Sequence, residues 1–202
     1  MNEKFFDLKK EKQDRMINAA LKIFALNGYA HASTDDIVKE AGISKGLLFH
    51  YFNSKIGLYS FIYDYSARFT ALEMTSTVDR DDNDYFSLHV QIKKAESNVM
   101  RGYPFMIAFL NKAKEENVIE ALNEISSKKN IVPEKKEEFF KHANTYSIKS
   151  DIDVEKLNEI VEFTSEGIMK EVLKNVDTAP DAYYKNMKDY VVLLRNACYR
   201  PS

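Results

Sequence analysis

The segment Ser33–Lys55 constrains the fold more than any other part of the chain. It contains two short runs of apolar residues at helical spacing, separated by a turn of small residues at Ala41 and Gly42. Hydroxyl side chains favour helix starts, and glycine favours the left-handed position that ends a helix. The segment therefore predicts two short helices that meet at a sharp angle, with Thr34 as the N-cap of the first and Ser44 as the N-cap of the second.

Apolar residues recur at helical spacing in the rest of the chain as well. The clearest i, i+3, i+4, i+7 pattern is formed by Ile17, Ala20, Leu21 and Phe24. This first helix is expected to end at Asn27–Gly28. No segment alternates apolar and polar residues as a half-buried strand does, and the 202 residues include only six Gly and four Pro. The predicted fold class is therefore all-α.

Longer helices are expected beyond Lys55. Their predicted ranges are 57–75, 84–101, 104–116, 118–128, 133–146, 153–175 and 180–199, with Pro104 and Pro133 at helix starts. The acidic run 79–84 predicts a solvated loop, because it lacks the glycine and the terminal glutamate of a calcium-binding loop.

The charge and cysteine content exclude several classes of protein. Residues 1–60 contain nine Lys/Arg and seven Asp/Glu, while the whole chain has a net charge of -2. The chain is therefore no general polycation, although its N-terminal part has the sign expected for contact with phosphate. Cys198 is the one cysteine, so no intrachain disulfide can form. With no hydrophobic signal segment and no apolar run near the roughly 20 residues that span a bilayer, a cytoplasmic protein without a membrane partner is expected.

No catalytic or metal site is predicted. The chain has four histidines without the paired spacing of metal ligands, namely His31, His50, His89 and His142. It also lacks a phosphate-binding glycine-rich loop and a nucleophile elbow. We therefore predict that the chain is not an enzyme and needs no cofactor.

The second of the two short helices presents groups that can meet DNA, as the recognition helix of a helix-turn-helix does in the major groove. Lys45 can reach a phosphate or a guanine edge, Leu47 can touch a thymine methyl group, and Gly46 allows a close backbone approach. His50 and Tyr51 can donate to phosphate. The predicted DNA contacts are Thr34, Ser44, Lys45, Gly46, Leu47, His50, Tyr51 and Lys55. The alternative is that Leu47, Phe49 and Tyr51 are ordinary packing residues.

The chain from Ile17 to Leu58 resembles the DNA-binding domain of the tetracycline-repressor (TetR) family of bacterial transcription regulators. The matching positions are Ile17, Ala20, Phe24, Asn27–Tyr29, Thr34, Ile37, Ala41–Ser44, Gly46, Phe52, Lys55 and Leu58. The usual Tyr-x-His-Phe of the family's recognition helix is altered, because Phe49 stands for the tyrosine and Tyr51 for the histidine. Tyr51 is therefore expected to supply the hydroxyl group that Phe49 lacks.

The resemblance implies an all-helical homodimer with two domains. Residues 1–56 would bind a double-stranded DNA operator, and residues 57–202 would bind a small-molecule inducer and dimerise. The implied pocket would lie between the middle helices, where methionine and aromatic side chains suit an apolar ligand. Its expected lining is Tyr63, Tyr103, Phe105, Met106 and Phe109. Ordinary helix core is the alternative reading of these residues.

The last two predicted helices carry more apolar residues than a monomer is expected to expose. Two copies of this helix pair could form a four-helix bundle across a two-fold axis. The predicted interface residues are Leu157, Val161, Ile168, Met187, Tyr190, Val191 and Leu194. The alternative is burial against their own domain.

The predicted function is a ligand-responsive transcriptional regulator. In this hypothesis a repressor leaves a palindromic operator when a small, largely apolar inducer binds. The alternative hypothesis is a helical small-molecule-binding or protein-interaction module without specific DNA binding.

Overall fold

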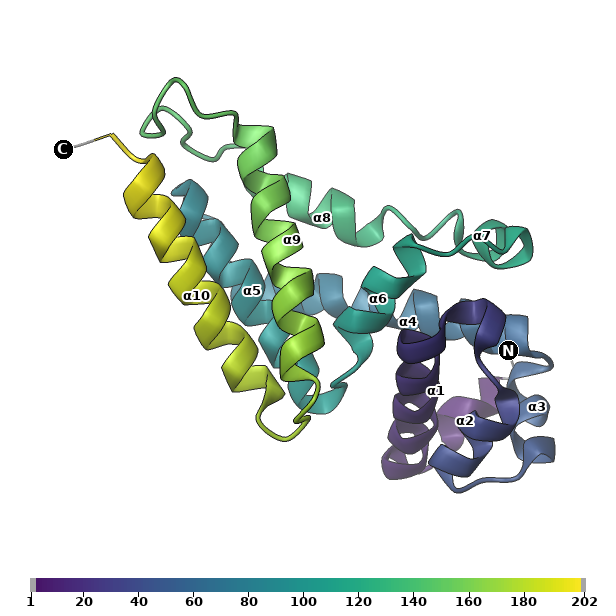
Figure 1. Ribbon diagram of the computed structural model, residues 1–202. Helices are drawn as coiled ribbons and strands as arrows, with labels where there is room; N and C mark the ends of the chain where they lie inside the picture. Colours follow the sequence, from purple (N-terminus) through teal and green to yellow (C-terminus); the bar gives the residue numbers. More distant parts are fainter. Residues whose placement is uncertain (1–2, 201–202) are drawn as a thin grey trace. The chain divides into compact units, whose positions relative to one another are not determined.

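The computed structural model describes residues 3–200 (Figure 1). This range contains one short 3-10 helix, η1 (Glu3–Asp7), ten α-helices and no strand, which confirms the all-α prediction. The α-helices are α1 (Lys10–His31), α2 (Thr34–Ala41), α3 (Lys45–Phe52), α4 (Lys55–Thr77), α5 (Tyr85–Gly102), α6 (Met106–Lys114), α7 (Ile119–Ile125), α8 (Ile131–Phe140), α9 (Val154–Val172) and α10 (Ala179–Cys198). None of these helices is long and apolar enough to cross a membrane.

The helices pack into two compact units. Unit 1 takes the chain up to Phe69 together with Phe105–Ile131, and unit 2 takes Thr70–Pro104 together with the chain from Val132 onward. Helix α4 contributes to both units. The boundary predicted between residues 56 and 57 separates a DNA-binding domain from a ligand-binding domain, not two compact units. This functional boundary stays a prediction. The outermost positions of its two ranges, residues 1–2 and 201–202, lie outside the described residues.

Helix α1 is the central helix of unit 1. Its predicted apolar face is buried, with Ile17 at 1% and Phe24 at 0% exposure, and both α2 and α6 pack against it. The predicted end at Asn27–Gly28 is a kink, because Gly28 has φ 67° and ψ 179° and one more helical turn follows to His31. The kink turns the end of α1 toward the loop that precedes α2.

Helices α5, α9 and α10 form the body of unit 2 (Figure 1). Its apolar core cluster contains Met74, Val78, Leu88, Ile92 and Ala95. Partly buried side chains from the α8 region pack against this cluster, namely Val132, Phe139, Phe140 and Ala143. Helix α8 itself contains no buried residue, so it covers the core without entering it.

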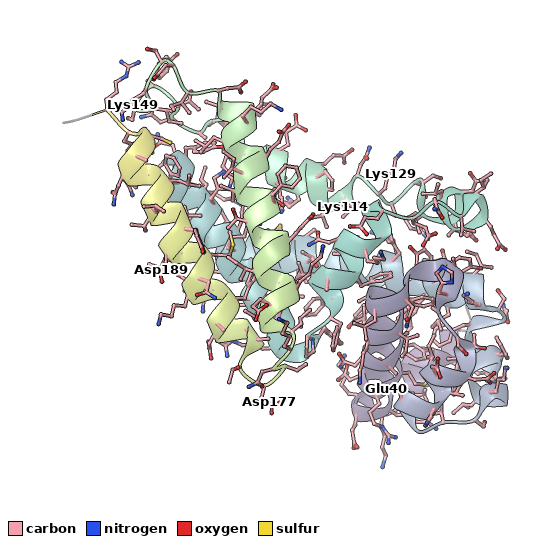
Figure 2. The ribbon with its side chains drawn as sticks, in the orientation of Figure 1. Glu40, Lys114, Lys129, Lys149, Asp177 and Asp189 are labelled. Carbon is pink, nitrogen blue, oxygen red and sulfur yellow. The ribbon has the colours of Figure 1, made fainter. Side chains whose placement is uncertain are left out.

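Several predicted helix boundaries are wrong. Helix α6 begins at Met106 instead of Pro104, and α8 spans Ile131–Phe140 instead of 133–146. Helices α7 and α9 end at Ile125 and Val172, three residues before the predicted ends. Helix α8 ends at Phe140, and backbone N–H groups after this residue donate to other segments of the chain. The N–H of Asn144 donates to Asn83 O at 2.7 Å, and the N–H of Lys149 donates to Cys198 O at 2.9 Å. Figure 2 shows Lys149 beside the end of α10, where its ammonium donates to Ala197 O at 2.7 Å.

Candidate nucleic-acid interface

The starts of α2 and α3 are capped by serine side chains. Ser33 Oγ accepts a hydrogen bond from Asp35 N at 3.1 Å, and Ser44 Oγ accepts one from Leu47 N at 3.2 Å. The predicted cap at Ser44 is confirmed. The predicted cap at Thr34 is wrong, because Ser33 has the extended backbone of an N-cap (φ -98°, ψ 130°) and Thr34 is already the first helical residue.

Replacing Ser33 with alanine is expected to lower the free energy of unfolding by about 1 kcal/mol, because the N–H of Asp35 loses its acceptor. Thr34→Ala is the matched control and should cost less than half as much. Urea unfolding of both variants followed by circular dichroism measures the difference. A larger loss for Thr34→Ala would contradict the cap assignment.

A left-handed glycine joins the two helices. Gly42 has φ 63° and ψ 42°, and its N–H donates to the Lys39 carbonyl at the end of α2. Ile43 N then donates to Val38 O at 3.0 Å, which closes the helix end. The buried side chain of Ala41 occupies little space at the corner. These contacts make α2 and α3 a helix-turn-helix.

The outer side of α3 is open to solvent. Ser44, Lys45, Gly46 and His50 are exposed, and Leu47 is half-buried. Apart from its chain neighbours and the backbone of its own helix, no atom of the described chain lies within 4 Å of the position that a Cβ on Gly46 would take. The packing of the chain therefore gives no reason for a glycine there, and the space stays free for an approaching partner.

The charge of this surface is largely balanced by local ion pairs. Lys45 Nζ lies 2.8 Å from Asp35 Oδ1, and both side chains are exposed. Glu40, labelled in Figure 2, is paired with Lys22 at 2.7 Å. Exposed pairs of this kind contribute about 0–1 kcal/mol, so Lys45 can exchange Asp35 for a phosphate at small cost.

Tyr51 does not lie on the open side of α3. It is 8% exposed, and its ring centroid lies 5.7 Å from that of Phe5 in an edge-on contact. The exposed position that a DNA contact of Tyr51 requires is not found, because η1 brings Phe5 against the Tyr51 ring. A contact of its hydroxyl with DNA stays a prediction. Phe49 is half-buried.

Lys55 begins α4, two residues before the predicted start of this helix, and its ammonium is engaged within unit 1. Nζ lies 3.4 Å from Ala30 O and 4.5 Å from the ring centroid of Tyr29. Burial lowers the pKa of Lys55, while the carboxylates of Glu116 and Glu120 act in the opposite direction. A phosphate contact would therefore require this side chain to turn away from Tyr29.

Two hydrogen bonds between Tyr29 and glutamate side chains fasten the end of α1, and no local sequence pattern predicts them. Tyr29 N donates to Glu116 Oε2 at 2.8 Å, and Tyr29 OH donates to Glu120 Oε2 at 3.1 Å. Burial and the neighbouring Glu120 raise the pKa of Tyr29 to about 12. Glu116 follows α6 and Glu120 lies in α7, so both hydrogen bonds join segments about 90 positions apart in the sequence. Hydrophobic periodicity cannot reveal a contact over this separation.

The five predicted pocket residues do not belong to one unit. Tyr63, Phe105, Met106 and Phe109 lie in unit 1, whereas Tyr103 lies in unit 2. In unit 1 the ring of Phe109 is buried, with centroid distances of 6.2 Å to Tyr63 and 5.6 Å to Tyr59. These rings form core in this structure, and their contact with a ligand stays a prediction.

The seven predicted interface residues divide into two groups. Four of them pack inside unit 2 and are at most 3% exposed, namely Leu157, Val161, Met187 and Val191. They offer no surface to a partner, so the alternative of burial in their own domain is correct for them. Tyr190 is 50% exposed, and Ile168 and Leu194 are half-buried.

Comparison with known proteins agrees with this geometry. The profile of the family described as "Bacterial regulatory proteins, tetR family" matches residues 16–60, which include both helices of the helix-turn-helix. The uncharacterised HTH-type transcriptional regulator YuxN of Bacillus subtilis (strain 168) is 31% identical over 97 residues. That alignment covers 48% of this chain and only 33% of YuxN.

Solved structures with the same fold extend over nearly the whole chain. A TetR family transcriptional regulator from Chloroflexus aurantiacus J-10-FL is 18% identical with a TM-score of 0.66, and the match covers 99% of both chains. The transcriptional regulator FadR from Bacillus subtilis, solved in complex with stearoyl-CoA, is 16% identical with a TM-score of 0.56 and covers 88% of this chain and 96% of its own. The chain is an all-helical protein with an N-terminal helix-turn-helix. Its residues 16–60 match the profile of the TetR family, and its fold is similar to that of solved TetR family regulators.

Proposed function

We propose that the chain is a ligand-responsive repressor that acts in the cytoplasm and leaves a near-palindromic DNA operator when a small molecule binds. The observation that carries this proposal is the open outer side of α3, held by the Ser44 cap and the Gly42 turn within the segment that matches the family profile. A ligand-bound neighbour, FadR with stearoyl-CoA, supports a ligand with a large apolar part.

A homodimer is favoured by an apolar stripe on the outer side of unit 2. Exposed residues recur at i, i+3, i+7 on α9 as Ile160, Phe163 and Gly167, and on α10 as Tyr190, Leu193 and Ala197. Phe163 is 70% and Leu193 is 63% exposed in the single chain. Pairing these helices with those of a second copy would bury the stripe in a four-helix bundle. The dimer would present two α3 helices to successive major grooves, roughly 34 Å apart.

Leu193→Lys is expected to weaken this dimer by about 30-fold, because a buried apolar contact in each copy is replaced by an unpaired charge. Sedimentation velocity over a range of concentrations measures the dissociation constant. Ile119→Lys is the control, since Ile119 is 74% exposed but lies in unit 1. A monomeric wild type, or equal dissociation constants for the two variants, would contradict the proposed interface.

Unit 1 offers a route by which a ligand could alter DNA binding. Helix α6 packs along α1, and Glu116 and Glu120 hold the backbone and hydroxyl of Tyr29 beside Lys55. A shift of α6 and the following loop would therefore act on the helix against which α2 packs. Such a shift needs a ligand that binds the two conformations with different affinities, since tight binding alone changes no equilibrium.

Removing either lysine is expected to weaken operator binding in a distinct way. Lys55→Ala should reduce affinity for all DNA sequences about equally and flatten the log–log salt dependence by about 0.9, the share of one phosphate. Lys45→Ala should also reduce the preference for the operator over unrelated DNA, because Lys45 can reach a guanine edge. Fluorescence anisotropy at several salt concentrations measures both effects.

Lys188→Ala provides the control for these variants, because Lys188 is exposed on α10 in unit 2. If Lys45→Ala and Lys55→Ala bind the operator as tightly as this control does, the assignment of Lys45 and Lys55 is contradicted.

The alternative function, a helical binding module without specific DNA recognition, is favoured by the burial of Tyr51 and the internal contacts of Lys55. Wild-type affinity that is equal for every DNA sequence would establish that alternative.

A further inference from the structure

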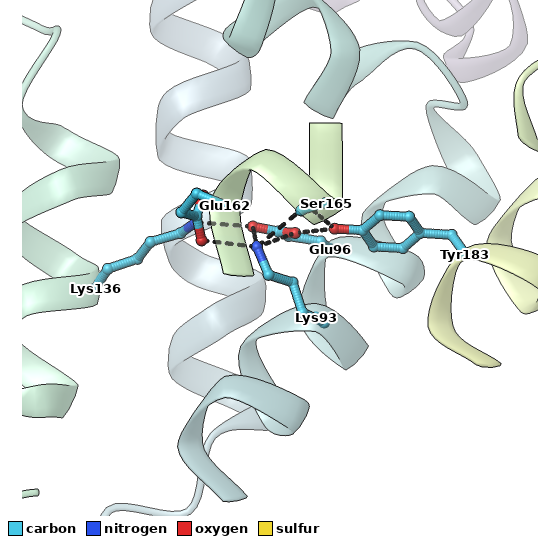
Figure 3. A network of polar contacts seen from close by, with 6 residues as sticks. All are labelled: Lys93, Glu96, Lys136, Glu162, Ser165 and Tyr183. Atoms are coloured by element: carbon cyan, nitrogen blue, oxygen red, sulfur yellow. Dashed lines mark hydrogen bonds and ion pairs between the residues drawn. The ribbon is translucent and has the colours of Figure 1, made fainter. Parts of the chain in front are cut away.

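A cluster of charged side chains lies inside unit 2 (Figure 3). Lys93 and Glu96 on α5 are 1% and 3% exposed. Lys93 Nζ lies 3.2 Å from Glu96 Oε2 and 2.9 Å from Glu162 Oε1 on α9. Tyr183 OH of α10 donates to Glu96 and lies 2.6 Å from Ser165 Oγ, which is 3.3 Å from Lys93 Nζ. Three helices thus direct polar groups at one buried point.

A second ammonium reaches the same carboxylates from α8. Lys136 Nζ lies 3.0 Å from Glu96 Oε1 and 3.2 Å from Glu162 Oε2. Figure 3 shows the Lys136 side chain entering from the opposite side to Tyr183. These two ammonium groups hold the pKa of the Glu162 carboxyl well below its usual range. Helix α8 has no buried residue, and the ion pairs of Lys136 connect it to the carboxylates of the cluster.

An unpartnered polar atom lies on the same face of α5. His89, one helical turn before Lys93, is 2% exposed, and its Nε2 has no hydrogen-bond partner among the described residues. The imidazole contacts two aromatic rings, with centroid distances of 4.6 Å to Phe140 and 4.8 Å to Tyr85. Phe140 lies one turn after Lys136 on α8. Helix α8 therefore places an ammonium over two carboxylates and an aromatic ring over an unsatisfied imidazole.

We propose that Glu96 and Glu162 form the binding site of an aryl-alkyl ammonium ligand. In this structure Lys136 occupies the position of the ligand's ammonium group, and Phe140 occupies the position of its aromatic ring. The ligand's ammonium would take the place of Lys136 Nζ, and its ring would replace Phe140 against His89 and Tyr85. A polar group on the ring could pair with His89 Nε2. Binding would displace α8 from the core cluster of unit 2. The link to DNA release rests on the proposed function, whereas the site itself does not.

The charges of the cluster determine which ligands it accepts. Two carboxylates facing Lys93 alone would leave one buried negative charge uncompensated, which is strongly unfavourable. A cation restores neutrality when Lys136 leaves, whereas a neutral alcohol or a carboxylate of the same shape does not. The proposed site therefore refines the inducer expected from the sequence: the ligand is largely apolar but has a positively charged end.

Lys136→Ala tests the site by chemical rescue. The probe is 4-phenylbutylamine, and the matched controls are 4-phenylbutanol and 4-phenylbutyrate. We expect the variant to melt at a lower temperature than the wild type and to be restored, with saturation, by the amine alone. The amine should bind the variant at least about tenfold more tightly than the wild type, because no lysine competes for the carboxylates. Equal effects of the three compounds, or equal amine affinity in both proteins, would overturn the proposal.

Two further comparisons keep the test decisive. Lys135→Ala should show no rescue, because Lys135 pairs with Glu138 and lies over the Phe139 ring instead of the carboxylates. If Lys136→Ala does not fold, Glu162→Gln in the otherwise intact chain should weaken amine binding at least about tenfold, whereas Glu159→Gln, whose carboxylate pairs with Lys156 at the surface, should not. Equal amine affinity in the two glutamine variants would overturn the proposal as well.

The amine site and the DNA-binding function are tested by separate measurements, so either proposal can be refuted without the other. Saturable amine binding in a protein that binds no operator would support the site and refute the regulator. Operator binding without amine binding would do the reverse. Both are read by separate methods, isothermal titration calorimetry for the amine and fluorescence anisotropy for DNA.

Discussion

Replacing Lys93 with methionine is expected to lower the free energy of unfolding by about 3–5 kcal/mol at pH 7. Lys93 is 1% exposed, and its ammonium is shared by Glu96 and Glu162. Without it, two carboxylates inside unit 2 would depend on Lys136 alone, and one buried negative charge would have no partner. Urea unfolding followed by circular dichroism measures the loss.

Two companion variants show whether the charge is responsible. Lys94→Met changes the neighbouring, half-buried lysine, whose ammonium lies 4.7 Å from the ring centroid of Tyr184, and should cost about 1 kcal/mol or less. Adding Glu162→Gln to Lys93→Met should recover part of the stability, because a buried charge of each sign is then removed. A loss no larger for Lys93→Met than for Lys94→Met would show that the cluster tolerates an unpaired carboxylate.

Gly57→Ala is expected to destabilise unit 1 by about 3 kcal/mol, near the upper end for overpacking a tight site. A Cβ on Gly57 would lie 2.2 Å from the carbonyl oxygen of Phe52, a backbone atom at the end of α3. The clash can be relieved only by moving α3 relative to the start of α4. The variant should therefore lose both stability and operator affinity, measured by thermal unfolding and by anisotropy.

Gly46→Ala separates these two effects. No atom outside its own helix backbone and chain neighbours lies within 4 Å of its added methyl group among the described residues, so this helical substitution should raise stability by about 0.5–1 kcal/mol. The methyl group would lie on the open side of α3, so operator binding should weaken although folding does not. Wild-type stability of Gly57→Ala, or undiminished operator binding by Gly46→Ala, would contradict the respective contact.

The helix-turn-helix could be predicted from sequence because its signals are local. Gly42 and Ser44 act on their own helix ends, within three or four residues of the groups they contact. The adjacent hydroxyl groups of Ser33 and Thr34 could not be ranked as caps, because the choice depends on backbone angles. Tyr51 was misplaced because Phe5, which covers it, is 46 positions away in the sequence.

The second unit was less predictable for physical reasons. Helices α9 and α10 are apolar on two sides, so their periodicity could not show which side faces α5. The buried lysine of α5 resembles a solvated residue in the sequence, and only the approach of Glu162 and Lys136 reveals a neutralised interior site. The segment after α8 is held by a hydrogen bond from Asn144 to the distant Asn83.

The central claim is that α3 reads a specific DNA sequence. Its most direct test is fluorescence anisotropy of the wild-type protein with a labelled fragment from upstream of its own gene, compared with the same fragment in scrambled order. We expect the native fragment to bind at least about 10³-fold more tightly at physiological salt, with a steep loss of affinity as salt rises. Equal affinity for the two fragments at every salt concentration would contradict the account.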